Sequence, residues 1–90
     1  MRVYRVVGRV QGVGFREWTR RTADAMGLVG SVRNRPDGSV EVQVSGPDDA
    51  LARLEKLLET GPPAAQVERV ERLPPADGAM PVRGFRVLYS

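Results

Sequence analysis

The stretch SVEVQVSGPDDALARLEKLLETG, residues 39–61, changes its hydrophobic period midway and indicates how the chain folds. In residues 39–45 valines alternate with polar residues, which predicts a strand with one buried face. Pro47 and two aspartates then begin a segment that ends at Gly61, and its leucines recur at helical spacing: Leu51, Leu54, Leu57 and Leu58. The stretch therefore predicts a strand followed by a helix that buries a leucine stripe.

The residues before this stretch predict a strand, a helix and a second strand. Residues 2–10 alternate between apolar and polar positions, as in a half-buried strand. Helical spacing follows, with Gly27 placed to end the helix, and the face expected to be buried comprises Phe15, Trp18, Thr22, Ala25 and Met26. Residues 28–34 predict a strand that the turn RPDG, residues 35–38, joins to residues 39–45 as a hairpin.

The last third of the chain adds two strands. Residues 66–73 carry an apolar residue at every third position, and we interpret them as an exposed strand that could contain a bulge. Residues 74–81 predict a loop, and Phe85, Val87 and Tyr89 mark a final strand. The order βαββαβ plus a C-terminal strand predicts an α+β, ferredoxin-like split βαβ fold, with two helices on one face of a mostly antiparallel sheet.

Composition removes several functional classes. The chain has 90 residues, which predicts a single domain over 1–90, and it contains neither cysteine nor histidine. We therefore expect no disulfide, no thiol nucleophile, no zinc site built from cysteine or histidine, and no imidazole base. The net charge is +3 with acidic residues interspersed, so no nucleic-acid-binding tract is indicated. The first 20 residues contain no long apolar run, and we expect a cytoplasmic monomer that contacts no membrane.

The segment GRVQGVGFREW, residues 8–18, indicates an anion site where the first strand meets the first helix. Gly12 and Gly14 can adopt a positive φ, which lets successive backbone N–H groups point at one spot. Arg16 would lie at the positive end of the helix dipole, which is unfavourable unless an anion lies between them. The alternative is a tight turn only, with Arg16 paired to Glu17 or to another carboxylate. Neither the P-loop pattern nor the dinucleotide-binding spacing is present.

Two separated motifs resemble those of the acylphosphatase family. VVGRVQGVGFR, residues 6–16, matches the family's first signature, G-x-V-Q-G-V-x-F-R, without a mismatch. GSVRNRPDGSVEVQVSG, residues 30–46, resembles the second, with Asn34, Gly38, Val40 and Gly46 at matching spacing. Ser31 departs from the family pattern, which usually has an aromatic residue there, and this puts local packing in question more than chemistry. The resemblance covers essentially the whole chain.

The resemblance implies hydrolysis of the carboxyl–phosphate anhydride of acyl phosphates, without a metal or cofactor, to carboxylate and inorganic phosphate. It places Arg16 on the catalytic arginine that holds the phosphate and Asn34 on the asparagine that orients the attacking water. The loop whose backbone amides surround the phosphate is formed by Gln11, Gly12, Val13, Gly14 and Phe15. Inorganic phosphate, the product, should then be a competitive inhibitor. Glu17 is expected to stabilise the helix rather than act as a base.

Three other interpretations stay open from the sequence. The domain could bind an anion or carbamoyl phosphate without catalysis, as acylphosphatase-like domains also occur within larger carbamoyl-transferring maturation proteins. It could bind RNA on its sheet, although residues 39–45 offer only valines and Tyr4 alone is a weak stacking platform. Asn34 could merely shape the turn that follows it. The sequence does not specify the acyl group.

Four aromatic residues are expected in the core rather than in the chemistry: Tyr4, Phe15, Trp18 and Phe85.

Overall fold

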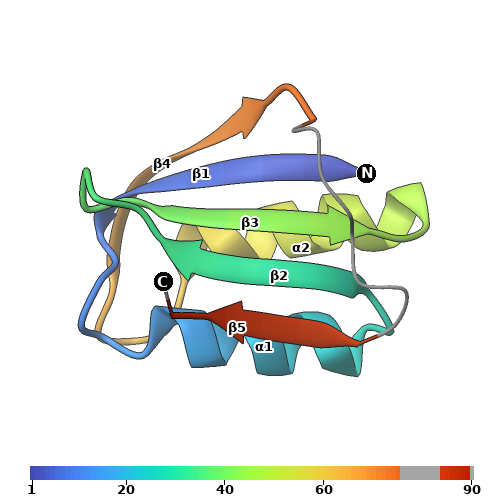
Figure 1. Ribbon diagram of the computed structural model, residues 1–90, viewed down its shortest axis with the longest axis horizontal. Coiled ribbons are helices and arrows are strands. Elements are labelled where there is room, and N and C mark those ends of the chain that lie inside the picture. Colours follow the sequence, from blue (N-terminus) through green and yellow to red (C-terminus); the bar gives the residue numbers. More distant parts are fainter. Residues whose placement is uncertain (76–83, 90) are drawn as a thin grey trace.

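The computed structural model describes residues 1–75 and 84–89, and its element order is the predicted one (Figure 1). The elements are β1 (Arg2–Arg9), α1 (Phe15–Ala25), β2 (Val29–Asn34), β3 (Val40–Ser45), α2 (Asp48–Thr60), β4 (Gln66–Leu73) and β5 (Phe85–Leu88). Four strands are one residue shorter than predicted at one end. The residues that lie just outside them are Val10, Leu28, Ser39 and Tyr89. Part of the loop predicted over 74–81 lies outside the described residues.

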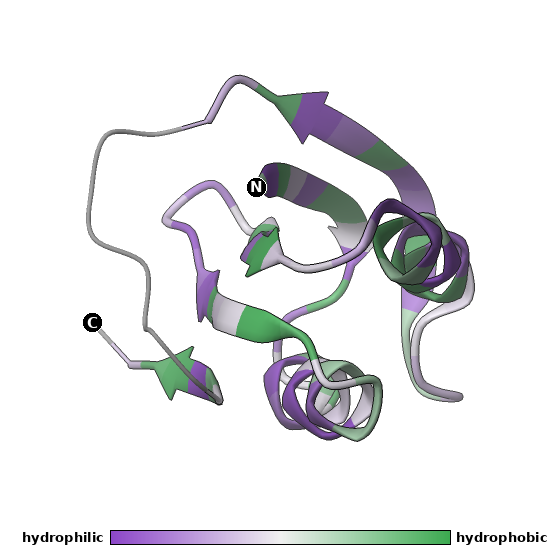
Figure 2. Cartoon of the chain, turned by 90° about the vertical axis from the view of Figure 1, so that its right-hand side faces the viewer, coloured by the Kyte–Doolittle hydropathy of each residue, from purple (hydrophilic) through white to green (hydrophobic). Residues whose placement is uncertain are grey.

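The strands form one sheet in the order β4-β1-β3-β2-β5. Neighbouring strands are antiparallel except β2 and β5, which run parallel. Both helices cover the same face of this sheet, and the described residues place no helix on the other face (Figure 2). The predicted ferredoxin-like α+β fold is therefore confirmed, with β5 as the added edge strand.

The core lies between the helices and the sheet. Val40, Val42 and Val44 are fully buried, as the alternation of β3 predicts. Facing them are Leu51, Leu54 and Leu58 of α2, also buried. The aromatic residues expected in the core are buried too (Tyr4, Phe15 and Phe85), whereas Trp18 packs at its margin with its ring centroid 5.4 Å from that of Phe15.

Two predicted helix faces need correction. On α2, Leu57 is 42% exposed, because the sheet covers only the stripe through Leu54 and its buried neighbours. On α1 the buried residues are Phe15, Thr19 and Ala23, spaced four apart, while Ala25 is exposed. The small side chains of Thr19 and Ala23 let α1 lie close to the sheet. The Thr19 hydroxyl donates to the Phe15 carbonyl at 2.8 Å, so the burial of Thr19 leaves no unpaired donor.

A bulge in β4 explains why Val67 and Val70, three residues apart, face the same side. Val7 pairs with Arg69, but the next residue, Gly8, pairs with Val67, so β4 has one extra residue at this point. The extra residue brings Val67 and Val70 to the same side, where both pack against the core. Gly8 has φ 137°, and a Cβ there would collide with the backbone of β4. The exposed, bulged strand is thus confirmed, and only glycine suits β1 opposite the bulge.

Leu54 and Leu57 provide a matched test of how α2 packs. We expect Leu54→Ala to lower the free energy of unfolding by about 2–5 kcal/mol, because it opens a cavity in the core. Leu57→Ala should change it by about 0.5 kcal/mol or less, because that side chain is largely outside the core. Urea unfolding of both variants measures the difference. Equal losses would contradict the observed orientation of α2.

Candidate active site

The loop between β1 and α1 turns through two glycines in left-handed conformation. Gly12 has φ 74°, and Gly14, at the N-cap of α1, has φ 76°. A Cβ would meet no neighbour at either position, so backbone conformation rather than crowding selects glycine. No side chain of the described residues caps α1 at this end. The first N–H groups of the helix are therefore available to an external acceptor, and the helix dipole favours an anion there.

A hollow of about 130 Å³ opens beside this helix end. It lies where the start of α1 approaches the ends of β2 and β5 (Figure 1). Since one water needs about 10–15 Å³ of such space, the hollow has room for a tetrahedral oxyanion and a water. Its lining comprises Val10, Gly12, Gly14, Phe15, Arg16, Glu17, Asn34 and Tyr89.

Arg16 contributes a positive charge that no carboxylate in residues 1–75 and 84–89 neutralises. Its guanidinium carbon lies 4.6 Å from the centroid of the Tyr89 ring, which is a cation–π contact. Glu17 is paired with Arg20 instead, with a nitrogen–oxygen distance of 2.6 Å. The alternative in which Arg16 pairs with Glu17 is therefore wrong. A cation that the described residues leave without a carboxylate, placed beside a helix N-terminus, makes the hollow chemically suited to an anion.

Asn34 faces the hollow from the last position of β2. It lies two residues beyond the fully buried Val32, so alternation along the strand turns its side chain to the helix-covered face. Its Oδ1 is buried and has no hydrogen-bond partner within the described residues. An unpaired buried oxygen costs about 1–3 kcal/mol, so such an atom calls for an explanation. A water or a ligand group that donates a hydrogen bond in the hollow would satisfy it.

The Gln11 side chain links the glycine loop to the β2–β3 hairpin. Its amide nitrogen donates to the carbonyl of Arg35 at 2.8 Å and to that of Ser39 at 2.9 Å, at either end of the turn. Sequence reasoning considered only the backbone of Gln11, and no local pattern could reveal partners 24 and 28 residues away. These two bonds fix the loop, which carries Arg16, relative to the strand end that carries Asn34.

The remaining loop residues divide between the hollow and its support. Of the residues expected to surround the phosphate, Gly12, Gly14, Phe15 and Arg16 line the hollow. Gln11 and Val13 do not belong to the lining, and Val13 packs against the core instead. The described residues bring no three potential metal-ligating side chains together. The structure thus places Arg16 and Asn34 around one hollow, with the glycines between them.

Charged groups fasten the turn that follows Asn34. The Asp37 carboxylate accepts hydrogen bonds from the Ser39 backbone at 2.9 Å and from Arg5 at 2.8 Å. The bonds from Ser39 and Arg5 hold the pKa of Asp37 far below its usual value. Arg5 also pairs with Glu71 of β4 at 2.8 Å. The hairpin is therefore held from the helix-free face as well as by Gln11.

No helix within the described residues has the length and apolar character needed to cross a membrane.

Comparisons with known proteins agree on one family. A family model described as Acylphosphatase matches residues 2–87. A protein named acylphosphatase from Caldivirga maquilingensis is 55% identical over 86 residues, which are 94% of this chain and 90% of that protein. One from Alkalilimnicola ehrlichii is 53% identical over 87 residues, 97% of this chain and 96% of that protein.

Solved structures show the same likeness. The crystal structure of acylphosphatase from Bacillus subtilis has a TM-score of 0.79 and 38% identity, and the match covers 99% of this chain and 100% of that one. The crystal structure of T. kodakarensis HypF matches with a TM-score of 0.76 and 35% identity, over 100% of this chain but 12% of that longer chain.

The unpaired oxygen of Asn34 leads to a stability test. We expect Asn34→Ala to leave the free energy of unfolding unchanged or to raise it by up to about 1 kcal/mol, because a buried unsatisfied oxygen is removed. The control is Ser39→Ala, which should lower that free energy by about 1 kcal/mol or more, because the Ser39 hydroxyl bonds to the Asp37 carboxylate. Urea unfolding measures both. A clear loss in Asn34→Ala would instead make Asn34 a residue that shapes the turn.

Proposed function

The chain belongs to the acylphosphatase family and is a hydrolase of acyl phosphates, and on that premise we propose that the hollow beside α1 is its active site. One observation carries the proposal: an arginine that no carboxylate of the described residues neutralises and a buried asparagine oxygen without a partner among them line the same hollow, at an uncapped helix end. The first group suits a bound phosphate, and the second suits an attacking water. That phosphate inhibits competitively, and that the protein is a cytoplasmic monomer, stay predictions.

Arg16 and the glycine loop would bind the phosphate group of the substrate. The guanidinium fork matches two phosphate oxygens, and backbone N–H groups at the start of α1 would donate to the others. Phosphoryl transfer spreads negative charge over the equatorial oxygens in the transition state. Donors that the fold already holds in place stabilise this charge with little reorganisation, so Arg16 and the loop would serve both binding and catalysis.

Asn34 would orient the water that attacks phosphorus. Its side-chain oxygen accepts a hydrogen bond from water and its NH₂ group can donate one, but neither takes up a proton at neutral pH. In the step, a bond forms from the water oxygen to phosphorus while the bond from phosphorus to the acyl oxygen breaks. The carboxylate leaves with the bonding electron pair, and a phosphate oxygen takes the water's proton. Because a carboxylate is a stable leaving group, the step needs no strong general acid.

Glu17 is poorly suited to act as a general base although it lines the hollow. Both of its carboxylate oxygens accept hydrogen bonds from Arg20, at 2.6–3.1 Å. These bonds lower the pKa of Glu17, so the carboxylate binds a proton less readily than an isolated one. We propose that Glu17 and Arg20 form the charged side of the opening, and that Asn34 alone directs the water.

Two alternatives that the sequence left open find no specific support in the fold. RNA stacking on the sheet needs exposed aromatic residues, but Tyr4 is fully buried and the helix-free side of β1 and β3 carries the charged Arg5 and Glu41. The match to HypF covers only 12% of that longer chain, so it gives no specific reason to prefer a non-catalytic phosphate-binding module to the hydrolase. A hydrolysis assay distinguishes this module from the enzyme.

Replacing Arg16 tests the phosphate site. With benzoyl phosphate as substrate and EDTA present, we expect Arg16→Ala to lower kcat by at least roughly 10²–10³, as on removal of a preorganised oxyanion donor. Inhibition by phosphate should weaken in parallel. The control Arg53→Ala removes an exposed arginine of α2, outside the hollow, and should keep both properties. Hydrolysis of p-nitrophenyl phosphate should be slow throughout, because its leaving group is poorer. Unchanged turnover in Arg16→Ala would refute the assignment.

Replacing Asn34 separates water orientation from phosphate binding. Asn34→Ala should lower kcat by roughly 10² while the inhibition constant of phosphate stays nearly the same, because Arg16 and the loop remain. Asn34→Asp provides the contrast: it keeps the size of the side chain but adds a negative charge, so phosphate inhibition should weaken as well. Steady-state kinetics with phosphate titrations measure both constants. Normal turnover in Asn34→Ala would show that the residue only shapes the turn.

A further inference from the structure

We propose that Tyr89 is the specificity residue of this site, and that its ring contacts the acyl group so that aromatic acyl phosphates are preferred to small ones such as acetyl phosphate. This inference rests on the proposed function, because it presumes that the phosphate lies against Arg16. It adds the chemical class of the acyl group, which the sequence leaves open.

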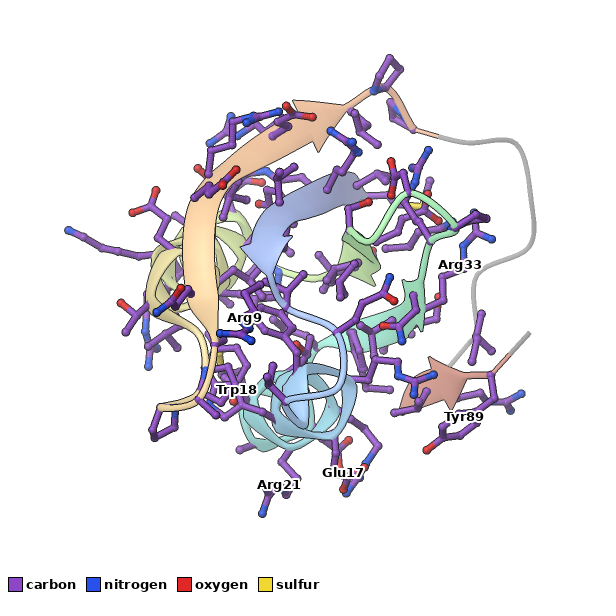
Figure 3. The ribbon with its side chains drawn as sticks, turned by 90° about the vertical axis from the view of Figure 1, so that its left-hand side faces the viewer. Arg9, Glu17, Trp18, Arg21, Arg33 and Tyr89 are labelled. Atoms are coloured by element: carbon purple, nitrogen blue, oxygen red, sulfur yellow. The ribbon has the colours of Figure 1, made fainter. Side chains whose placement is uncertain are left out.

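The register of the sheet brings Tyr89 to the hollow. β2 and β5 are parallel, and Arg33 pairs with Leu88. The next residue after each of these is Asn34 at the end of β2 and Tyr89 just after β5, and both line the hollow. Alternate residues of β5 from the buried Phe85 face the helices, which puts Tyr89 on the side of α1. Figure 3 shows Tyr89 extending from the end of β5 toward α1, whose first turn carries Glu17.

The Tyr89 ring is held in place yet remains open to a ligand. The Arg16 guanidinium lies over it at 4.6 Å, so the ring is anchored beside the group expected to bind phosphate. Even so, Tyr89 is 76% exposed, more than any other large hydrophobic side chain among the described residues. Most of the aromatic surface at the opening is therefore free to contact a bound molecule.

The size of the hollow directs the acyl group toward this ring. A phosphate group with its attacking water would occupy much of the space of about 130 Å³. The acyl group, which is joined to phosphorus through one oxygen, must then extend to the opening. There Glu17 is paired with Arg20 and offers a charged surface, whereas Tyr89 offers an aromatic one. Of these two side chains, Tyr89 is the one with which a planar apolar acyl group gains contact, while an acetyl group is too short to gain much.

Substrate preference tests this inference. We expect Tyr89→Leu to lower kcat/KM for benzoyl phosphate about three- to tenfold, the range of an aromatic pair contact, and that for acetyl phosphate by less than about twofold. Tyr89→Phe keeps the ring and should keep the preference of the unmodified protein. Equal losses on both substrates would show that Tyr89 only positions Arg16, and no loss on either would show no role. Both outcomes overturn the inference.

A binding measurement separates this inference from the proposed function. Benzoylphosphonate and acetylphosphonate carry a carbon–phosphorus bond that the enzyme cannot hydrolyse, and calorimetry gives their affinities. The unmodified protein should bind benzoylphosphonate more tightly, and Tyr89→Leu should remove most of that difference. If the protein shows this affinity difference but hydrolyses neither substrate, the proposed active site is refuted and the contact between Tyr89 and the aryl group is retained. If it hydrolyses both substrates but shows no affinity difference, the aryl contact is refuted and the proposed active site is retained. Urea unfolding should show equal stability, since residue 89 is exposed.

Discussion

The proposed active site depends on one backbone constraint: β1 must pass into α1 through two glycines in left-handed conformation, Gly12 and Gly14. This turn leaves the helix end uncapped and brings Arg16 to it, so two positive features face one hollow. The Gln11 side chain then joins the loop to the turn after β2. Because the loop and β2 are joined in this way, Arg16 and Asn34 keep a fixed relation to each other. In the proposed reaction, a phosphate bound by Arg16 and a water bound by Asn34 would therefore be aligned before the attack.

Polar groups at the hollow differ from those on the helix-free face of the sheet. On that face, Arg33 and Arg35 both pair with Glu41 at 2.9 Å, and these partners hold the pKa of Glu41 below its usual value despite its burial. At the hollow, by contrast, Arg16 lacks a carboxylate partner and the Asn34 oxygen lacks a donor within the described residues. Unsatisfied groups lower stability, and the packed core offsets this cost. They are the groups that a substrate and a water would satisfy.

The one departure from the family motif lies away from this chemistry. Ser31 pairs with Gln43 of β3 and with Arg86 of β5. Alternation along β2 puts its side chain on the helix-free face, opposite to Asn34. An aromatic residue there would cover part of that open face and would not reach the hollow. The departure therefore alters the surface of the sheet and leaves the arrangement of Arg16 and Asn34 intact.

The sequence by itself determined the element order, the fold class and the place of the glycine loop, because hydrophobic period and turn residues are local properties. The pair Arg16 and Asn34 followed from the resemblance of two motifs to those of the family, and its role stays a prediction. The sequence could not determine which helix residues are buried: Ala25 and Leu57 share helical faces with core residues, yet the sheet leaves both exposed. Nor could it show that Gln11 bonds to the β2–β3 turn or that Tyr89 completes the hollow. Those contacts arise from strand order and register, which join residues far apart in the chain, and only the folded sheet sets them.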